Sequence, residues 1–256
     1  MAKRMQEHED DENEYLGSKN VAPALARYAL EHEHHDEVGG KDCEAWTNEW
    51  WTWILSLEET KNPFTTVGEL NMERYRGGQP LEVQKKLNDD KKESVWFLAA
   101  SPYGSGTVRI HIPPGKWSIL ATPYVACASP QLYPSLKTLE ALNNLVENDV
   151  RRVKELWVDL DGISLAGCIS RTEKPFPIHQ VPKKNIFGIE GTKEQMNKRG
   201  IANIQDGKFS IDLVHYGRWF WLKPLSTGDH LLHLHGYSEI YELDVKYQLT
   251  VAGPEE

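Results

Sequence analysis

The stretch YELDVKYQLTV, residues 241–251, decides the fold class. Apolar or aromatic side chains occupy every second position from Tyr241 to Val251, and polar side chains such as Glu242 and Gln248 fill the positions between them. Successive side chains of a strand point to opposite faces, so this alternation predicts a strand with one buried and one solvated face. Such strands are typical of antiparallel sheets that cover a core on one side only.

Further short runs of strand-forming residues lie upstream, separated by turn signals. The strongest turn signal is Asp161-Gly162, which is typical of a two-residue hairpin. About seven to nine strands with turns every 8–12 residues or so indicate a jelly-roll-like β-sandwich. The strands are predicted over residues 94–100, 107–112, 117–125, 156–160, 163–165, 209–213, 218–222 and 231–235.

Two helices are expected beside the sheets. Trp46, Trp50 and Trp53 recur at the helical period, which predicts an aromatic helix that packs on a sheet face. A second helix of about five turns is expected from an N-cap at Ser135 to about Trp157. The predicted fold is therefore mostly β: an antiparallel sandwich with an N-terminal aromatic helix and one long crossover helix.

Charge is distributed unevenly along the chain. The 256 residues include 29 Lys and Arg against 38 Asp and Glu, for a formal charge of −9. Residues 1–44 hold 12 acids and 5 bases, a net of −7, so we expect a partly disordered acidic segment before a single domain at 45–256. We expect residues 172–207 to form a long connection.

Several classes of protein are excluded by composition. Without a basic excess, nucleic-acid binding is not expected, and no apolar run is long enough for a membrane helix. The N-terminus lacks the apolar stretch of an export signal, so a cytoplasmic location is expected. The three cysteines form no C-x-x-C pair, which argues against a cysteine zinc site, and a single Cys127–Cys168 bridge stays open.

A series of motifs resembles a known family. These are Trp46-x-x-x-Trp50-Trp51-x-Trp53, Asn62-Pro63, Gly68, Val95-Trp96-Phe97-Leu98-Ala99, Arg109, Pro113-Pro114-Gly115-Lys116, Asp161-Gly162, Pro224-Leu225-x-x-Gly228-x-His230 and Tyr247-x-Leu249-Thr250-Val251. In this order, over residues 45–251, the chain resembles a family of uncharacterised bacterial and archaeal proteins, many of them exported. The resemblance implies no agreed activity. Two features depart from the family pattern: the acidic segment where relatives often carry an export signal, and an apparent insertion at residues 84–93.

The stretch from His230 to His235 contains the best candidates for metal-ligating side chains. In a strand, His233 and His235 project from one face, where two imidazoles can converge on a divalent transition metal such as Cu, Fe or Zn. The same histidines can equally be ordinary polar residues of an exposed sheet face. We expect His230 to bond the turn backbone instead. Candidates for a third ligand are His111, Glu239, His215 and Asp229.

Three further residues are candidates for binding a substrate. Arg109 shares a strand face with His111 and is suited to an anionic group, or to an ion pair with a local acid. Trp219 and Trp221 could stack on sugar rings, but an apolar strand of this kind more often lies in the core.

Two functions therefore remain. One is a binding module without catalysis, for a small molecule, carbohydrate or protein ligand, because the chain has no Gly-x-Ser-x-Gly elbow, P-loop or dinucleotide fingerprint. The alternative is a mononuclear metalloprotein, an oxidase or hydrolase that uses His233 and His235. The presence of a third ligand beside this pair distinguishes the two.

Overall fold

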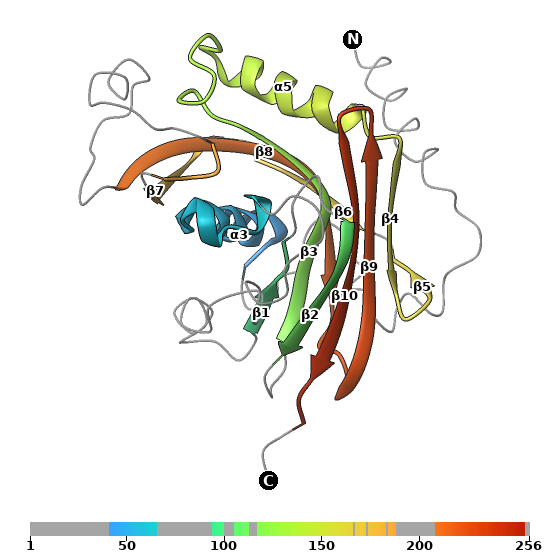
Figure 1. Ribbon diagram of the computed structural model, residues 1–256. Coiled ribbons are helices and arrows are strands. Elements are labelled where there is room, and N and C mark those ends of the chain that lie inside the picture. The colour runs from blue at the N-terminus through green and yellow to red at the C-terminus, as the bar shows by residue number, and fades with distance from the viewer. Residues whose placement is uncertain are drawn as a thin grey trace.

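The structure is a computed structural model. It describes residues 41–65, 94–99, 105–112, 117–187 and 208–253, and within the range 117–187 it leaves out residues 166, 173 and 183. The acidic segment up to residue 40, the apparent insertion at 84–93 and residues 188–207 of the long connection lie outside the described residues. The described chain is mostly β, with two five-stranded sheets and two α-helices (Figure 1). The predicted β-sandwich with an N-terminal helix is confirmed.

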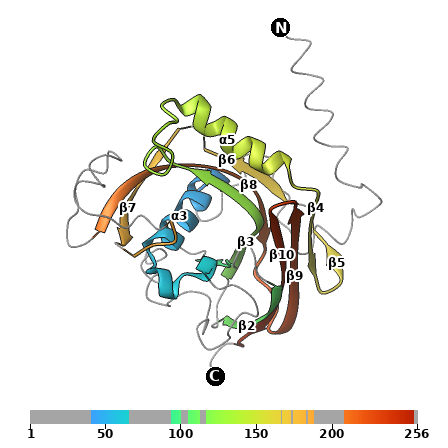
Figure 2. The ribbon, with the colours of Figure 1, turned by 45° about the horizontal axis from the view of Figure 1, so that its top comes forward.

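The first sheet is built around one long strand, β8, which curls strongly (Figure 2). The predicted strands at 209–213 and 218–222 are two halves of this single strand. Both faces are buried at its C-terminal end, where Trp219 packs on one side and Phe220 on the other, whereas Lys208 and Asp212 near its start are exposed. The sheet runs β1 (Ser94–Phe97), β3 (Trp117–Ala128), β8 (Lys208–Leu222), β6 (Cys168–Arg171), and β7 (Phe176–Pro182) also pairs with β8.

The second sheet contains the strand that decides the fold class. It runs in the order β2 (Ser105–Ile112), β10 (Tyr241–Val251), β9 (Gly228–Ser238), β4 (Glu155–Leu160) and β5 (Ile163–Ser164). The predicted hairpin between β4 and β5 is confirmed, and its turn residues Asp161 and Gly162 have φ values of 53° and 82°. Each sheet also contains one parallel pair, β1 with β3 and β2 with β10, so both sheets are mixed rather than purely antiparallel as expected. The antiparallel prediction rested on alternation, which does not reveal the direction of a neighbouring strand.

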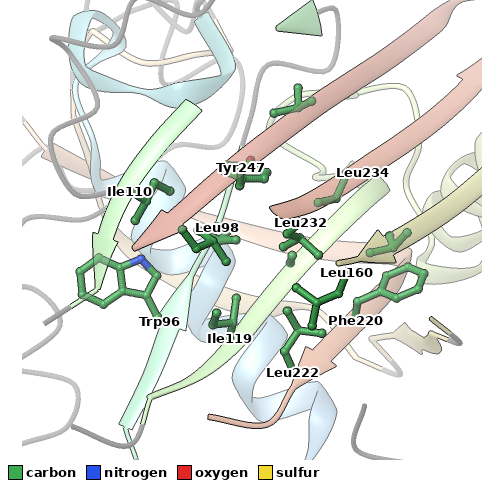
Figure 3. Close-up of a cluster of buried hydrophobic side chains, with 14 of the residues drawn as sticks. Trp96, Leu98, Ile110, Ile119, Leu160, Phe220, Leu222, Leu232, Leu234 and Tyr247 are labelled. Carbon is green, nitrogen blue, oxygen red and sulfur yellow. The ribbon is translucent and has the colours of Figure 1, made fainter. Parts of the chain in front are cut away.

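The core between the sheets collects the inward side chains of both (Figure 3). Leu232 and Leu234 of β9 and Tyr247 of β10 meet Ile119 of β3 and Phe220 of β8 in this cluster. The inward face of the second sheet is therefore fully used for packing, and its polar side chains point away from the core.

The aromatic helix is α3 (Cys43–Ser56), and it lies in the hollow of the curled first sheet (Figures 1 and 2). The Asp42 carboxylate caps it by accepting from the backbone N–H of Ala45 at 2.7 Å. The four tryptophans of the helix, at positions 46, 50, 51 and 53, are buried against the sheet. The predicted packing is confirmed. Two short 3₁₀ turns follow, η1 (Glu59–Lys61) and η2 (Pro63–Thr65).

The second helix, α5 (Leu139–Arg151), is shorter than expected. Its N-cap is Thr138 rather than Ser135, and it ends before β4 begins at Glu155. Trp157 is therefore a strand residue, although it continues the helical spacing. The apolar stripe of α5 packs through Leu142 and Val146 on β3 and β8. Within the described residues, no helix is long and apolar enough to cross a membrane.

Candidate functional site

The exposed face of the second sheet carries most of the candidate residues. His233 and His235 of β9 project from this face, while Leu232 and Leu234 are buried beneath it, as predicted. The two imidazoles differ in their contacts. His233 Nε2 lies 2.5 Å from Asp244 Oδ1, whereas His235 Nε2 lies 3.6 Å from Glu155 Oε2, beyond hydrogen-bond distance, and His235 Nδ1 has no hydrogen-bond partner among the described residues.

Trp157 of β4 covers the same two histidines. Its ring stacks on His235 with centroids 5.0 Å apart and meets His233 edge-on at 4.6 Å. Trp157 was assigned both to the end of the predicted helix and to the predicted strand at 156–160, and it was not among the predicted site residues. Arg151 and Arg152, which are typical of a helix C-terminus, and the alternation that follows them could have corrected the assignment.

Two of the four candidates for a third metal ligand, His111 and Glu239, lie at opposite ends of the second sheet. His111 of β2 is opposite Thr250, beside the start of β9. Glu239 lies in the turn at the other end of β9 and is paired with Lys154 at 2.8 Å. Across the residues that the structure describes, no three His, Cys, Asp or Glu side chains are grouped so that they could hold a metal ion.

His215, another candidate ligand, is buried between α3 and the first sheet. Thr47 donates its hydroxyl hydrogen to the carbonyl of Glu44, so the His215 Nε2–H is the donor toward Thr47 Oγ1 at 3.2 Å and Asn48 Oδ1 at 3.1 Å. His215 Nδ1 has no hydrogen-bond partner. Burial lowers the pKa of His215 to about 3, so the ring is neutral at pH 7.

The tryptophan candidates also belong to this buried region. Trp219 is 0% exposed and Trp221 is 3% exposed. Trp219 packs edge-on against Trp50, and Trp221 packs against Trp46. The sequence analysis favoured a core position for both, and their burial confirms it. Neither ring can serve as a sugar-stacking platform on the surface.

Cys127 carries a free thiol, so the Cys127–Cys168 bridge that the sequence left open is not formed. Burial raises the pKa of the Cys127 thiol to about 12, with a smaller contribution from the charge of Asp149. A thiol with such a pKa is almost entirely protonated at pH 7 and is a poor nucleophile.

Arg109 lies in a concave part of the exposed face, which we call the Arg109 pocket. The strand register builds it from two neighbouring rows of outward side chains that cross β2, β10 and β9. One row is Arg109, Gln248 and Leu231, and the next is His111, Thr250 and Asp229. The pocket has a volume of about 520 Å³, which is in the range of small-molecule sites.

The polar groups of the Arg109 pocket are held by hydrogen bonds along these rows. Arg109 Nε–H donates to Gln248 Oε1 at 2.8 Å, and the Thr250 hydroxyl donates to Asp229 Oδ1 at 2.7 Å. The ion pair of Arg109 with a local acid, which the sequence left open, is not formed with any residue that the structure describes. Gln248 and Thr250 were predicted to face solvent, but their place in a pocket depends on the neighbours of β10.

His230 lies at the edge of the pocket beside Asp161. His230 Nδ1 lies 2.7 Å from Asp161 Oδ2, and Nε2 lies 2.9 Å from the carbonyl oxygen of Ser226. The predicted bond to the turn backbone is confirmed. Burial lowers the pKa of His230, but the hydrogen bonds to Asp161 and to the Ser226 carbonyl outweigh it, so the pKa lies above its ordinary value.

The combination of Ser226, His230 and Asp161 has the residue types of a nucleophile, a base and an orienting acid. Ser226 Oγ lies 3.3 Å from His230 Nε2. However, both ring nitrogens face stronger acceptors, a carboxylate and a carbonyl oxygen, and two acceptors require two N–H donors. In this geometry neither ring nitrogen offers a lone pair to the Ser226 hydroxyl, so the arrangement ties the β4–β5 turn to the start of β9.

No family model, curated protein or solved structure matches the chain in the comparisons with known proteins. The resemblance to an uncharacterised bacterial and archaeal family therefore stays a prediction.

Proposed function

We propose that this protein is a binding module that takes a small polar ligand into the Arg109 pocket, without catalysis. The observation that carries the proposal is the exposed guanidinium of Arg109, fixed through its Nε by Gln248 at 2.8 Å. Among the described residues, this bond leaves the two terminal amino groups of Arg109 without a hydrogen-bond partner. A pre-oriented guanidinium in a pocket of about 520 Å³ is suited to recognise a small ligand by charge-assisted hydrogen bonds.

A binding role without catalysis is supported by how the pocket's reactive residue types are used. Both ring nitrogens of His230 face acceptors, the Asp161 carboxylate and the Ser226 carbonyl, so neither offers a lone pair to a substrate proton in this geometry. The metalloprotein alternative has less support, because His233 and His235 each have a carboxylate partner and the described chain groups no third ligand with them.

A ligand panel tests the proposal. Thermal unfolding of the protein would be followed with free amino acids, their N-acetyl and amide derivatives, monocarboxylates and monosaccharides at millimolar concentration. A ligand that binds the folded state at 100 times its Kd stabilises that state by about 2.7 kcal/mol. We expect at least one compound to raise the midpoint temperature of the wild type but not of the Arg109→Gln variant.

Lys246→Gln supplies the matched control. Lys246 also projects outward from β10, two residues from Gln248, but does not line the pocket. Its substitution removes one positive charge from the same sheet face and should leave ligand binding unchanged. The proposal fails if no compound stabilises the wild type, or if Arg109→Gln and Lys246→Gln reduce the stabilisation equally.

A further inference from the structure

The Arg109 pocket has opposite charges on its two sides. Arg109 belongs to β2, and Asp229 belongs to β9, with β10 between them. Neighbouring strands are about 4.8 Å apart, so the two backbones are separated by roughly 10 Å, and the side chains can reach over β10 from both sides. A ligand above Gln248 and Thr250 therefore has a cation on one side and a carboxylate on the other.

Some charged groups of the pocket already make hydrogen bonds within the protein, and others have atoms that can still bond a ligand. Asp161 is fully used, since Oδ1 accepts from the backbone N–H of Leu231 at 2.7 Å and Oδ2 pairs with His230. Asp229 uses only Oδ1, for the hydroxyl of Thr250. Among the described residues, Asp229 Oδ2 and the terminal amino groups of Arg109 have no hydrogen-bond partner, although the charge of Asp229 also contributes to the raised pKa of His230.

This arrangement discriminates between classes of small molecule. A simple anion bound to Arg109 would be placed near the Asp229 carboxylate, and a simple cation bound to Asp229 would be placed near the guanidinium. A molecule that carries both charges a few ångströms apart satisfies both groups at once. Charge-assisted hydrogen bonds of this kind are shorter and stronger than neutral ones.

We propose that the Arg109 pocket binds a zwitterionic amino compound of the size of a free amino acid. Its carboxylate pairs with the terminal amino groups of Arg109, and its ammonium group donates to Asp229 Oδ2. This inference rests on the proposed function, since it names the ligand class of the same pocket.

Leu231 adds an apolar contact to the same site. It occupies the row of Arg109 and Gln248, and its side chain is 41% exposed. Burying this surface under the side chain of a ligand is favourable in proportion to the apolar area covered. Aliphatic amino acids are therefore expected to bind better than glycine.

Calorimetric titration with L-valine and two of its derivatives tests the inference. N-acetyl-L-valine lacks the ammonium charge and L-valinamide lacks the carboxylate, while both keep the side chain. We expect L-valine to bind at least tenfold more tightly than either derivative. If either derivative binds as tightly as L-valine, the pocket recognises a single charge and the zwitterion inference is overturned.

Two variants test which residue binds the ammonium group of the ligand and which binds its carboxylate. Asp229→Asn keeps an acceptor for Thr250 and removes only the charge, and Arg109→Gln removes the guanidinium. Each should weaken L-valine binding at least tenfold, whereas Lys246→Gln should leave it unchanged. Asp229→Asn should leave the weak binding of N-acetyl-L-valine undiminished, because that compound has no ammonium group.

Different results would contradict this inference and the proposed function. If L-valine does not bind but a monosaccharide or a monocarboxylate stabilises the wild type and not Arg109→Gln, the ligand class is wrong and the pocket stands. If no compound of the panel depends on Arg109, the proposed function fails together with the inference.

Discussion

The hollow of the first sheet and the exposed face of the second sheet use histidine in opposite ways. In the hollow, His215 is buried between α3 and β8, and burial lowers its pKa to about 3. On the exposed face, His230 lies between the Asp161 carboxylate and the Ser226 carbonyl, which raise its pKa above the ordinary value. Desolvation therefore favours the neutral form of one ring, and hydrogen-bond acceptors favour the charged form of the other.

Aromatic side chains show the same division. Trp50 in the hollow is 0% exposed and donates its indole N–H to the carbonyl of Leu98 at 2.9 Å. Trp157 on the exposed face is 38% exposed and packs mainly on two histidines. The hollow thus provides stability, and the exposed face is available for recognition.

The largest expected effect comes from replacing these two tryptophans. Trp50→Ala removes a fully buried ring and leaves a cavity, so it should lower the free energy of unfolding by about 3–5 kcal/mol. Trp157→Ala removes a half-exposed ring and should lower it by less than about 1 kcal/mol. Urea unfolding measures both.

If the Trp50→Ala variant does not fold, Trp50→Phe can be measured in its place. It keeps an aromatic ring but removes the hydrogen bond to Leu98 and part of the packed ring volume, with an expected loss of about 1–3 kcal/mol. Equal losses for substitutions at positions 50 and 157 would contradict the division between a packed hollow and an accessible face.

The next effect is a loss of stability in mild acid that depends on His215. Its folded pKa of about 3 lies below the ordinary value of 6.5, so the unfolded chain binds a proton that the folded chain does not. The contribution of the neutral ring is present above pH 6.5 and is lost as the pH falls toward 3. Between pH 7 and pH 5, the wild type should lose about 2 kcal/mol through this group.

His215→Gln isolates this contribution, because glutamine does not titrate. The free energy of unfolding of the wild type relative to the variant should fall by about 2 kcal/mol from pH 7 to pH 5. A constant difference between the two proteins over this range would show that His215 is accessible to protons in the folded state.

The sequence predicts where the helices and strands of this fold lie better than it predicts which strands pair with one another. The alternation in Tyr241–Val251 and the tryptophan spacing of α3 report burial directly, and both predictions are confirmed. The end of α5 was placed too late because Val153 and Trp157 happen to continue the helical period. Local periodicity carries no information on where a tertiary contact replaces a helix by a strand.

The candidate site was predicted only in part, for a related reason. Arg109 was identified as a binding residue, but Gln248 and Asp229 become its neighbours only through the parallel pairing of β2 with β10 and the antiparallel pairing of β10 with β9. The pairing of Arg109 with Gln248 joins positions 139 residues apart, and no short motif encodes it, whereas Asp229 and Thr250 are only 21 residues apart. The same limit applies to Asp161, which a turn explains fully until its contact with His230 is seen.

The smallest effect expected concerns that contact, and its pH dependence has the opposite sign to that of His215. The raised pKa of His230 gives stability that is present below pH 6.5 and is lost as the pH rises through the folded pKa. Asp161→Asn keeps one acceptor oxygen, which can still accept from the backbone N–H of Leu231, and keeps the left-handed turn, but it replaces the second oxygen with an NH2 donor and removes the charge. It should lower the pKa of His230, measured by NMR titration of its ring protons, and should reduce stability below pH 6.5 by less than about 1 kcal/mol, because the pair is partly solvated. A His230 pKa that is unchanged by the substitution would mean that the Ser226 carbonyl alone holds the charged ring.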